Sequence, residues 1–237
     1  MKVTTNETLI EQRSKWAKRL APLTMLFLIG GLITNFMSVN NPDLFRPTLI
    51  LLALGFVSAI FSSHLVNTWV REPRADQVLG QVLKKFGNDY LLFNYTAPVP
   101  HVLLAPDGLY VIVVKNHGDQ ITVDGRKFKR KFTAARLLRL FADEGLGSPI
   151  NEIEGKMSKL QKYLGGQVSE ENMPEIKPLI LFSNKKVQLT IDNPAVPVLT
   201  TSELKTFFRE QGKNRTVSAE QRKMLAPLLG GKESDAQ

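Results

Sequence analysis

The chain of 237 residues contains no cysteine, which excludes a disulfide framework and every zinc site that depends on thiolate ligands. Histidine is also scarce. The three residues are His64, His101 and His117, and their spacing matches no metal cluster and no catalytic triad. The sequence has no phosphate-binding loop, no GxGxxG fingerprint and no nucleophile elbow. The enzyme classes that carry those motifs are therefore excluded.

Acidic residues are too few to balance the basic ones, and the net charge is +9. Such an excess favours anionic partners, either nucleic acid or lipid head groups. No acid occurs between Arg126 and Leu140, where cations alternate with Phe128 and Phe132. This pattern is typical of a surface that holds phosphates, although contact with anionic lipid and a solvated face without a partner are alternatives. The predicted binding residues are Arg126, Lys127, Lys129, Arg130 and Lys131.

Aspartate, glutamate, lysine and arginine are absent from two long runs, residues 20–42 and 47–70. Each run is apolar and long enough to cross about 30 Å of hydrocarbon as a helix. We therefore predict a two-helix membrane hairpin over residues 20–70, with spans at 21–38 and 48–69. Buried core helices are the alternative for both runs, and a signal peptide is the alternative for the first.

Basic residues flank the two runs unequally. Four precede the first span and two follow the second, whereas the connecting loop has only Arg46, which Asp43 offsets. The positive-inside rule then places both termini in the cytoplasm. We expect a multi-pass protein of a bacterial inner membrane, with a soluble cytoplasmic domain. The flanking cations are Arg13, Lys15, Lys18, Arg19, Arg71 and Arg74.

The soluble part centres on the stretch 100–125. Two apolar runs, 101–105 and 109–114, flank the turn Pro106-Asp107-Gly108, and a third run follows at 120–123. We expect a three-stranded antiparallel meander whose middle strand is buried on both faces, because it is apolar at every position. The remaining pattern predicts strands at 90–95, 126–132, 178–182, 187–191 and 196–199, and helices at 74–86, 133–141, 150–164, 203–211 and 219–225.

The order and spacing of these residues resemble the nuclease-related domain (NERD) family over about residues 72–210. The matching positions are His101-Val102-Leu103-Leu104, Pro106-Asp107-Gly108-Leu109-Tyr110-Val111-Ile112, Lys115-Asn116 and Gly118, followed by Asp124-Gly125 and Ser148-Pro149. The resemblance implies an α/β fold with a restriction-endonuclease-like mixed sheet. The implied domains are a basic N-terminal segment at 1–19, the hairpin at 20–70, the NERD-like domain at 71–212, and a C-terminal helix and tail at 213–237.

The chain departs from the family at the positions that hold a divalent metal ion. In the family the middle strand ends in Glu-x-Lys and an Asp precedes the His; here those acidic positions are Val113 and Pro100. Lys115 is the remaining catalytic residue of that set. The first helix of the family also donates an acid, for which Asp76 is the candidate. The family glutamine after the Asn-Pro pair is replaced by Glu152.

From these features we predict a membrane-anchored, catalytically inactive NERD-like protein, a pseudoenzyme without a cofactor. It is expected to bind DNA, RNA or a protein partner at the cytoplasmic face of the lipid bilayer. One alternative is a working Mg²⁺-dependent nuclease with acids from elsewhere, such as Asp76, Asp107 or Asp119. Another is a structural module of the membrane surface.

Overall fold

The computed structural model describes residues 1–131 and 145–230 of the chain. These residues divide into two compact units. One unit is a helical hairpin over residues 7–74. The other combines residues 1–6 with residues 75–131 and 146–230. The predicted mixed α/β class, with two long apolar helices near the N-terminus, is confirmed.

The hairpin consists of α1 (Glu7–Ser38) and α2 (Phe45–Trp69), joined by the short 3-10 helix η1 (Pro42–Leu44). Its seam is made of small residues. A Cβ added at Gly31 would lie 2.7 Å from a methyl carbon of Leu52, and one at Gly55 would lie 2.6 Å from a methyl carbon of Leu28. The buried residues recur every seven positions, a repeat that keeps one stripe of each helix in the seam. They are Ile10, Ala17, Thr24 and Gly31 on α1, and Thr48, Gly55 and Ser62 on α2.

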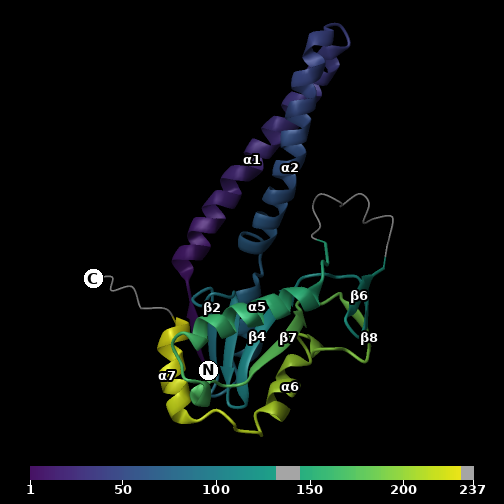
Figure 1. Ribbon diagram of the computed structural model, residues 1–237. Helices are drawn as coiled ribbons and strands as arrows, with labels where there is room; N and C mark the ends of the chain where they lie inside the picture. Colours follow the sequence, from purple (N-terminus) through teal and green to yellow (C-terminus); the bar gives the residue numbers. More distant parts are fainter. Residues whose placement is uncertain (132–144, 231–237) are drawn as a thin grey trace, which may run out of the picture. The chain divides into compact units, whose positions relative to one another are not determined.

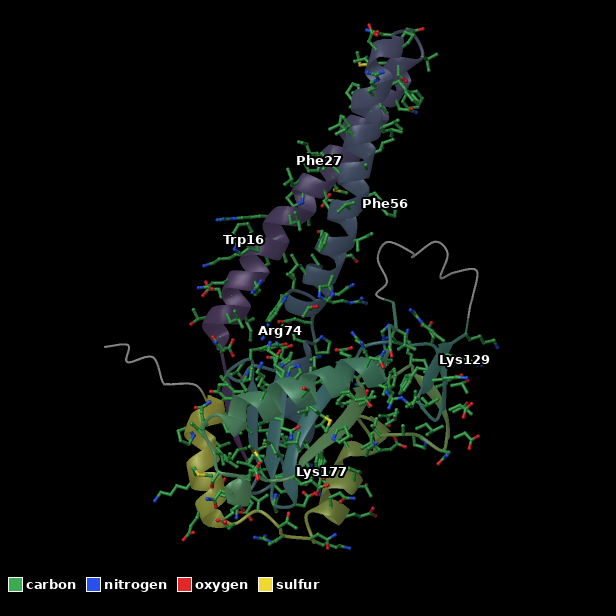
Figure 2. All side chains as sticks on the ribbon, in the orientation of Figure 1. Trp16, Phe27, Phe56, Arg74, Lys129 and Lys177 are labelled. Carbon is green, nitrogen blue, oxygen red and sulfur yellow. The ribbon has the colours of Figure 1, made fainter. Side chains whose placement is uncertain are left out.

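The outer surface of the hairpin is apolar, the reverse of a helix pair in water. Figure 2 shows Phe56 projecting from α2, and its side chain is 49% exposed. Both helices are long and apolar enough to cross a membrane. The core helix of a soluble protein would instead bury such a surface. The large exposed side chains include Met25, Leu26, Ile29, Leu32, Ile33 and Phe36 on α1, and Ile50, Leu54, Val57, Ile60 and Phe61 on α2.

The second unit is built on a six-stranded mixed sheet of order β1-β2-β3-β4-β7-β9 (Figure 1). The central strands β2, β3 and β4 are antiparallel, whereas β1 lies parallel to β2, and β7 is parallel to both β4 and β9. The strands are β1 (Lys2–Thr5), β2 (Leu91–Asn94), β3 (His101–Ala105), β4 (Gly108–Lys115), β7 (Ile176–Phe182) and β9 (Val198–Thr200).

Strand β1 has no counterpart among the elements expected from the sequence, which treated residues 1–19 as one basic segment. The backbone N–H groups of Lys2 and Asn6 donate to the carbonyl oxygens of Tyr90 and Asn94, at 3.1 and 3.0 Å. The side-chain amide of Asn94 also donates to the hydroxyl of Thr5 at 3.2 Å. A four-residue strand with one large apolar residue has too little pattern to be recognised without the neighbour it pairs with.

Helices cover both faces of the sheet. On one face, α5 (Pro149–Gly165) and α7 (Ala219–Gly230) pack against the side of β4 that carries Val111 and Val113. On the other, α3 (Ala75–Leu83) and α6 (Leu204–Gln211) pack against the side that carries Tyr110 and Ile112. As predicted, β4 is buried on both faces. The C-terminal helix α7 belongs to the same core as the rest of this unit.

A second sheet of three strands has the order β6-β5-β8 (Figure 1). It contains β5 (Gln120–Asp124), β6 (Lys127–Arg130) and β8 (Gln188–Asp192). The predicted third strand of the meander exists as β5, but its predicted pairing with β4 is wrong. The free edge of β4 is taken by β7 over seven residues, Leu109 to Lys115, so β5 pairs with β6 and β8 instead. The predicted helix 133–141 lies outside the described residues.

Candidate functional site

The antiparallel pairing of β3 and β4 brings the two positions expected to carry acids to one place. Val102 is opposite Val111. Continuing that register by two residues sets Pro100 opposite Val113, since partners on antiparallel strands move in opposite directions. Val113 is buried in the core beneath α5, and the carbonyl oxygen of Pro100 accepts a hydrogen bond from the backbone N–H of Tyr95 at 2.7 Å. The two positions that the resemblance assigns to acids therefore face each other, and neither has a side-chain carboxylate.

Lys115 ends β4 on the same face as Val113, because side chains two residues apart on a strand share a face. Its ammonium donates to Oε2 of Glu152, on α5, at 2.6 Å. The second oxygen of that carboxylate, Oε1, accepts from Lys156 at 2.6 Å. Lys115 and Lys156 are 16% and 25% exposed, so the cluster is largely shielded from water.

Charge balance in this cluster keeps Glu152 ionised. Burial raises the pKa of the Glu152 carboxyl, but hydrogen bonds and attraction from Lys115 and Lys156 outweigh it, and the pKa is lowered overall. One carboxylate between two ammonium groups leaves a net positive charge at the end of β4. Such a cluster favours an anion over a cation.

His101 is the first residue of β3, next to Pro100. Its Nδ1 is 2.9 Å from Oδ1 of Asn94, and its ring packs edge-on against Tyr95 with the centroids 5.0 Å apart. Tyr95 adopts a positive φ of 59°, which bends the chain between β2 and β3. Desolvation lowers the pKa of His101 to about 3, with a smaller contribution from the charge of Lys156. The imidazole is therefore neutral at physiological pH.

Pro100, Val113 and Glu152 offer Mg²⁺ no unoccupied carboxylate oxygen beside Lys115. This ion takes oxygen ligands, chiefly carboxylates and water. Val113 offers no side-chain oxygen, Pro100 offers a carbonyl that is already hydrogen-bonded, and both Glu152 oxygens are held by lysines. Within residues 1–131 and 145–230, no cluster of three or more histidine, aspartate or glutamate side chains has the arrangement of a metal site.

The other candidate acids lie elsewhere. Asp76 is buried on α3, whose apolar residues pack on the opposite face of the sheet from α5. Asp107 is in the turn at the far end of β4, where it binds Lys177 at 3.0 Å. Asp119 precedes β5 and is hydrogen-bonded to Arg130. The structure therefore does not gather these acids around Lys115.

The predicted basic stretch falls into two groups. Arg126 forms a two-pronged ion pair with Glu154 at 2.6 and 2.8 Å, and the Arg130 side chain is buried against Asp119. Lys127 and Lys129 on β6, and Lys131 directly after it, are exposed and alternate with Phe128 and Arg130, so they share one face. Phe128 packs against the core, so it is not available for stacking on a base.

Sequence reasoning noted Glu152 only as a departure from the family pattern and missed its role as the partner of Lys115. The spacing of Glu152 and Lys156 on a predicted helix was a usable signal, since residues four apart meet on a helix surface. Thr5 and Asn94, which support His101 from β1 and β2, carried no recognisable signal.

Comparison with known proteins agrees with this geometry. Residues 70–183 match the family model of the nuclease-related domain. The match runs from the end of the hairpin through β7, and it includes Pro100, Val113, Lys115 and Glu152. No curated protein and no solved structure matches the chain. Residues 70–183 of the chain are therefore similar to the nuclease-related domain.

Proposed function

We propose that this protein is a membrane-anchored nuclease-related domain that binds nucleic acid at the cytoplasmic face without cleaving it. The observation that carries this proposal is the ion-paired cluster of Lys115, Glu152 and Lys156 at the end of β4. There, both carboxylate oxygens of Glu152 are held by Lys115 and Lys156, while Pro100 and Val113 provide no carboxylate.

Metal-assisted cleavage of a phosphodiester needs carboxylates to hold the ion that activates water and neutralises developing charge. A divalent cation approaching Glu152 would have to displace an ammonium group and remain beside a second one. That arrangement is electrostatically unfavourable in a shielded site. A phosphate group, in contrast, is attracted to the two lysines. The chemistry of the cluster therefore favours binding over hydrolysis.

The test is a cleavage assay on the full chain in a neutral detergent, with single- and double-stranded DNA and with Mg²⁺ or Mn²⁺. We expect no metal-dependent product, and the Lys115→Ala variant should give the same result. Mg²⁺-dependent cleavage that Lys115→Ala abolishes would show that other acids complete the site, and it would overturn the proposal.

A second experiment restores the carboxylates at the two acidic positions of the family. Pro100→Asp combined with Val113→Glu places carboxylates at the two facing positions beside Lys115. We expect the double variant to acquire Mg²⁺-dependent protection against thermal unfolding, whereas each single variant should not. The introduced glutamate side chain costs stability when it is unpaired, so all comparisons are made with and without metal.

The anchoring part of the proposal rests on the connections between the two units. The chain enters α1 directly after β1 and leaves α2 shortly before α3, and both β1 and α3 belong to the mixed α/β unit. A hairpin that crosses a bilayer twice satisfies this connectivity, because both ends then lie on one side. The exposed cations Arg13, Lys15 and Lys18 on α1 support a cytoplasmic location for those ends.

Because the chain has no native cysteine, introduced cysteines report the topology directly. We expect Asn40→Cys, in the loop between α1 and α2, to react with a membrane-impermeant maleimide in intact cells. Lys186→Cys, at an exposed position of the mixed α/β unit, should react only after the membrane is permeabilised. The opposite pattern would reverse the orientation, and equal labelling of both in intact cells would exclude a cytoplasmic domain.

A further inference from the structure

The three-stranded sheet has one polar face, which contains none of the residues of the Lys115 cluster. Side chains alternate across a strand, and the strand register aligns those of β6, β5 and β8 into three rows. We call these nine residues the polar face. The rows are Lys131, Gln120 and Gln188; then Lys129, Thr122 and Thr190; then Lys127, Asp124 and Asp192.

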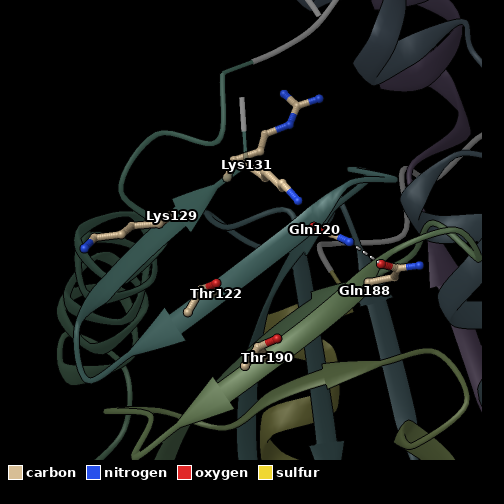
Figure 3. Close-up of a pocket in the computed structure, with 7 residues that line it drawn as sticks. Gln120, Thr122, Lys129, Lys131, Gln188 and Thr190 are labelled. Atoms are coloured by element: carbon tan, nitrogen blue, oxygen red, sulfur yellow. Dashed lines mark hydrogen bonds between the residues drawn. The ribbon is translucent and has the colours of Figure 1, made fainter. Parts of the chain in front are cut away.

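The opposite face of the same sheet is tied into the core. Ile121 and Val123 of β5 are 1% and 0% exposed, and Phe128 of β6 packs beside them. This packing fixes the sheet, so the polar face is displayed on a rigid support. Figure 3 shows Thr122 beside Thr190, and the amide of Gln120 hydrogen-bonded to Gln188 at 2.9 Å.

Charge is distributed unevenly over the polar face. Lys127 is directly opposite Asp124, and Asp192 completes that row, so this end carries no net positive charge. The other two rows contain only Lys129, Lys131 and neutral glutamine and threonine side chains. Within the part of the chain that the structure describes, neither of these two lysines forms an ion pair with an acid. The basic end is therefore the one suited to an anion.

The basic end also forms a hollow of about 420 Å³ (Figure 3). Its lining includes Lys129 and Lys131 together with the hydroxyl and amide groups of Thr122, Thr190 and Gln188. Arg130 also lines the hollow, but its side chain is only 6% exposed and is paired with Asp119. These side-chain types are the ones that contact phosphate and sugar in nucleic-acid complexes. The polar face has no aromatic residue, so it offers no platform for an unstacked base.

The spacing fits a phosphate backbone. Side chains on one face of a strand repeat about every 6.8 Å, so the ammonium groups of Lys129 and Lys131 can be separated by a similar distance. Successive phosphates along a nucleic-acid strand repeat at a closely similar distance. A partner with regularly placed phosphates and stacked bases, that is, a duplex, matches these features better than an unstacked single strand.

We propose that the basic end of the polar face, centred on Lys129 and Lys131, binds the phosphate backbone of duplex nucleic acid without regard to sequence. The inference rests on the proposed nucleic-acid-binding function and locates the surface that performs it. It also assigns Arg126, Lys127 and Arg130 no part in phosphate contact, because Arg126 and Arg130 form ion pairs with acids and Lys127 lies in the row that contains Asp124 and Asp192.

The experiment measures binding of the full chain, in a neutral detergent, to a fluorescent 20-base-pair duplex over a range of salt concentrations. Each phosphate contact on duplex DNA contributes about 0.9 to the slope of log affinity against log salt. Lys129→Gln with Lys131→Gln should therefore flatten the slope by about two units. The matched control is Arg126→Gln with Lys127→Gln. It removes the same charge at the neighbouring turn between β5 and β6, and it should leave the slope unchanged.

The outcomes separate this inference from the function on which it rests. If the unmodified chain binds neither the duplex nor a 20-base single strand at any salt concentration, the proposed nucleic-acid-binding function is wrong. If it binds only the single strand, the assignment to duplex is wrong. If it binds and both double variants lose affinity equally, binding depends on diffuse charge and the assigned surface is wrong. If the Lys129→Gln, Lys131→Gln variant loses binding only to vesicles that contain anionic lipid and not to the duplex, the assignment is also wrong. A melting temperature unchanged in both variants shows that folding is intact.

Discussion

The Nδ1 atom of His101 lies 2.9 Å from Oδ1 of Asn94, and the amide of Asn94 in turn donates to the hydroxyl of Thr5. This chain of contacts links β3, β2 and β1. An acceptor at Oδ1 requires the proton to be on Nδ1, so the neutral tautomer of the imidazole is defined by its neighbour.

The buried imidazole makes stability depend on pH. Burial lowers the pKa of His101 to about 3, below the value of about 6.5 in an unfolded chain. As the pH falls below about 6.5, the His101 imidazole becomes protonated in the unfolded state but stays neutral in the folded state. The free energy of unfolding should then decrease by about 1.4 kcal/mol per pH unit at most until the folded pKa is reached. Urea unfolding at pH 7.5, 6.0 and 5.0 measures this slope.

The control for that measurement is His101→Gln, which keeps a hydrogen-bonding side chain but cannot titrate. Carboxyl groups titrate in both proteins, so the difference between the two slopes reports His101 alone. Identical slopes in the two proteins would contradict the assigned environment.

The Glu152 cluster should contribute more stability than the neighbouring ion pair on the same helix. Glu152→Ala leaves Lys115 and Lys156 shielded and without their shared partner, and we expect a loss of about 1–2 kcal/mol. Glu154→Ala breaks only the exposed pair with Arg126, so the unfolding midpoint should hardly change. Equal effects of the two substitutions in chemical unfolding would show that the cluster is not specially stabilising.

Strand β1 should tolerate proline at one position and not at the next. The N–H groups of Lys2 and Asn6 point to β2, and the alternation of a parallel strand makes Thr4 the donor between them. Thr4→Pro removes that hydrogen bond and should cost about 1–2 kcal/mol. The N–H of Val3 faces away from the ladder, so Val3→Pro should cost less. Hydrogen exchange of the β2 amides distinguishes the two, and faster exchange in Val3→Pro than in Thr4→Pro would contradict the register.

Alanine substitution at two adjacent glycines of α1, Gly30 and Gly31, should affect the stability of the hairpin differently. A Cβ at position 31 would approach the backbone nitrogen of Leu52 to 3.2 Å, whereas one at position 30 meets no atom closer than 4.0 Å. Gly31→Ala should therefore force the helices apart and cost about 1–2 kcal/mol. Gly30→Ala should be neutral or slightly stabilising, because alanine is the better helix former. Loss of helical circular dichroism on titration with a denaturing detergent measures both, and a reversed order would show a different seam.

Periodicity and apolar runs in the sequence were sufficient to identify most elements of this protein. The uncharged runs before residue 71 predicted both helices of the hairpin, and the fully apolar run 109–114 predicted a strand buried on two faces. The resemblance to the nuclease-related domain pointed to Lys115, Val113 and Pro100. The turn at Pro106-Asp107-Gly108 predicted the pairing of the strands on either side of it. Such features depend on neighbours within a few residues, so the sequence alone determines them.

Only the tertiary structure decided which distant elements meet. β1 pairs with a strand about ninety positions later in the chain, and β5 joins a separate sheet because β7 already covers the edge of β4. Likewise, Lys115 meets Glu152 through the packing of α5 on the sheet, and the cross-strand acids of β5 and β8 set Lys127 apart from Lys129 and Lys131. These contacts join residues far apart in the sequence, where local pattern has no influence and the competition of whole elements for the same edge or face selects the partner.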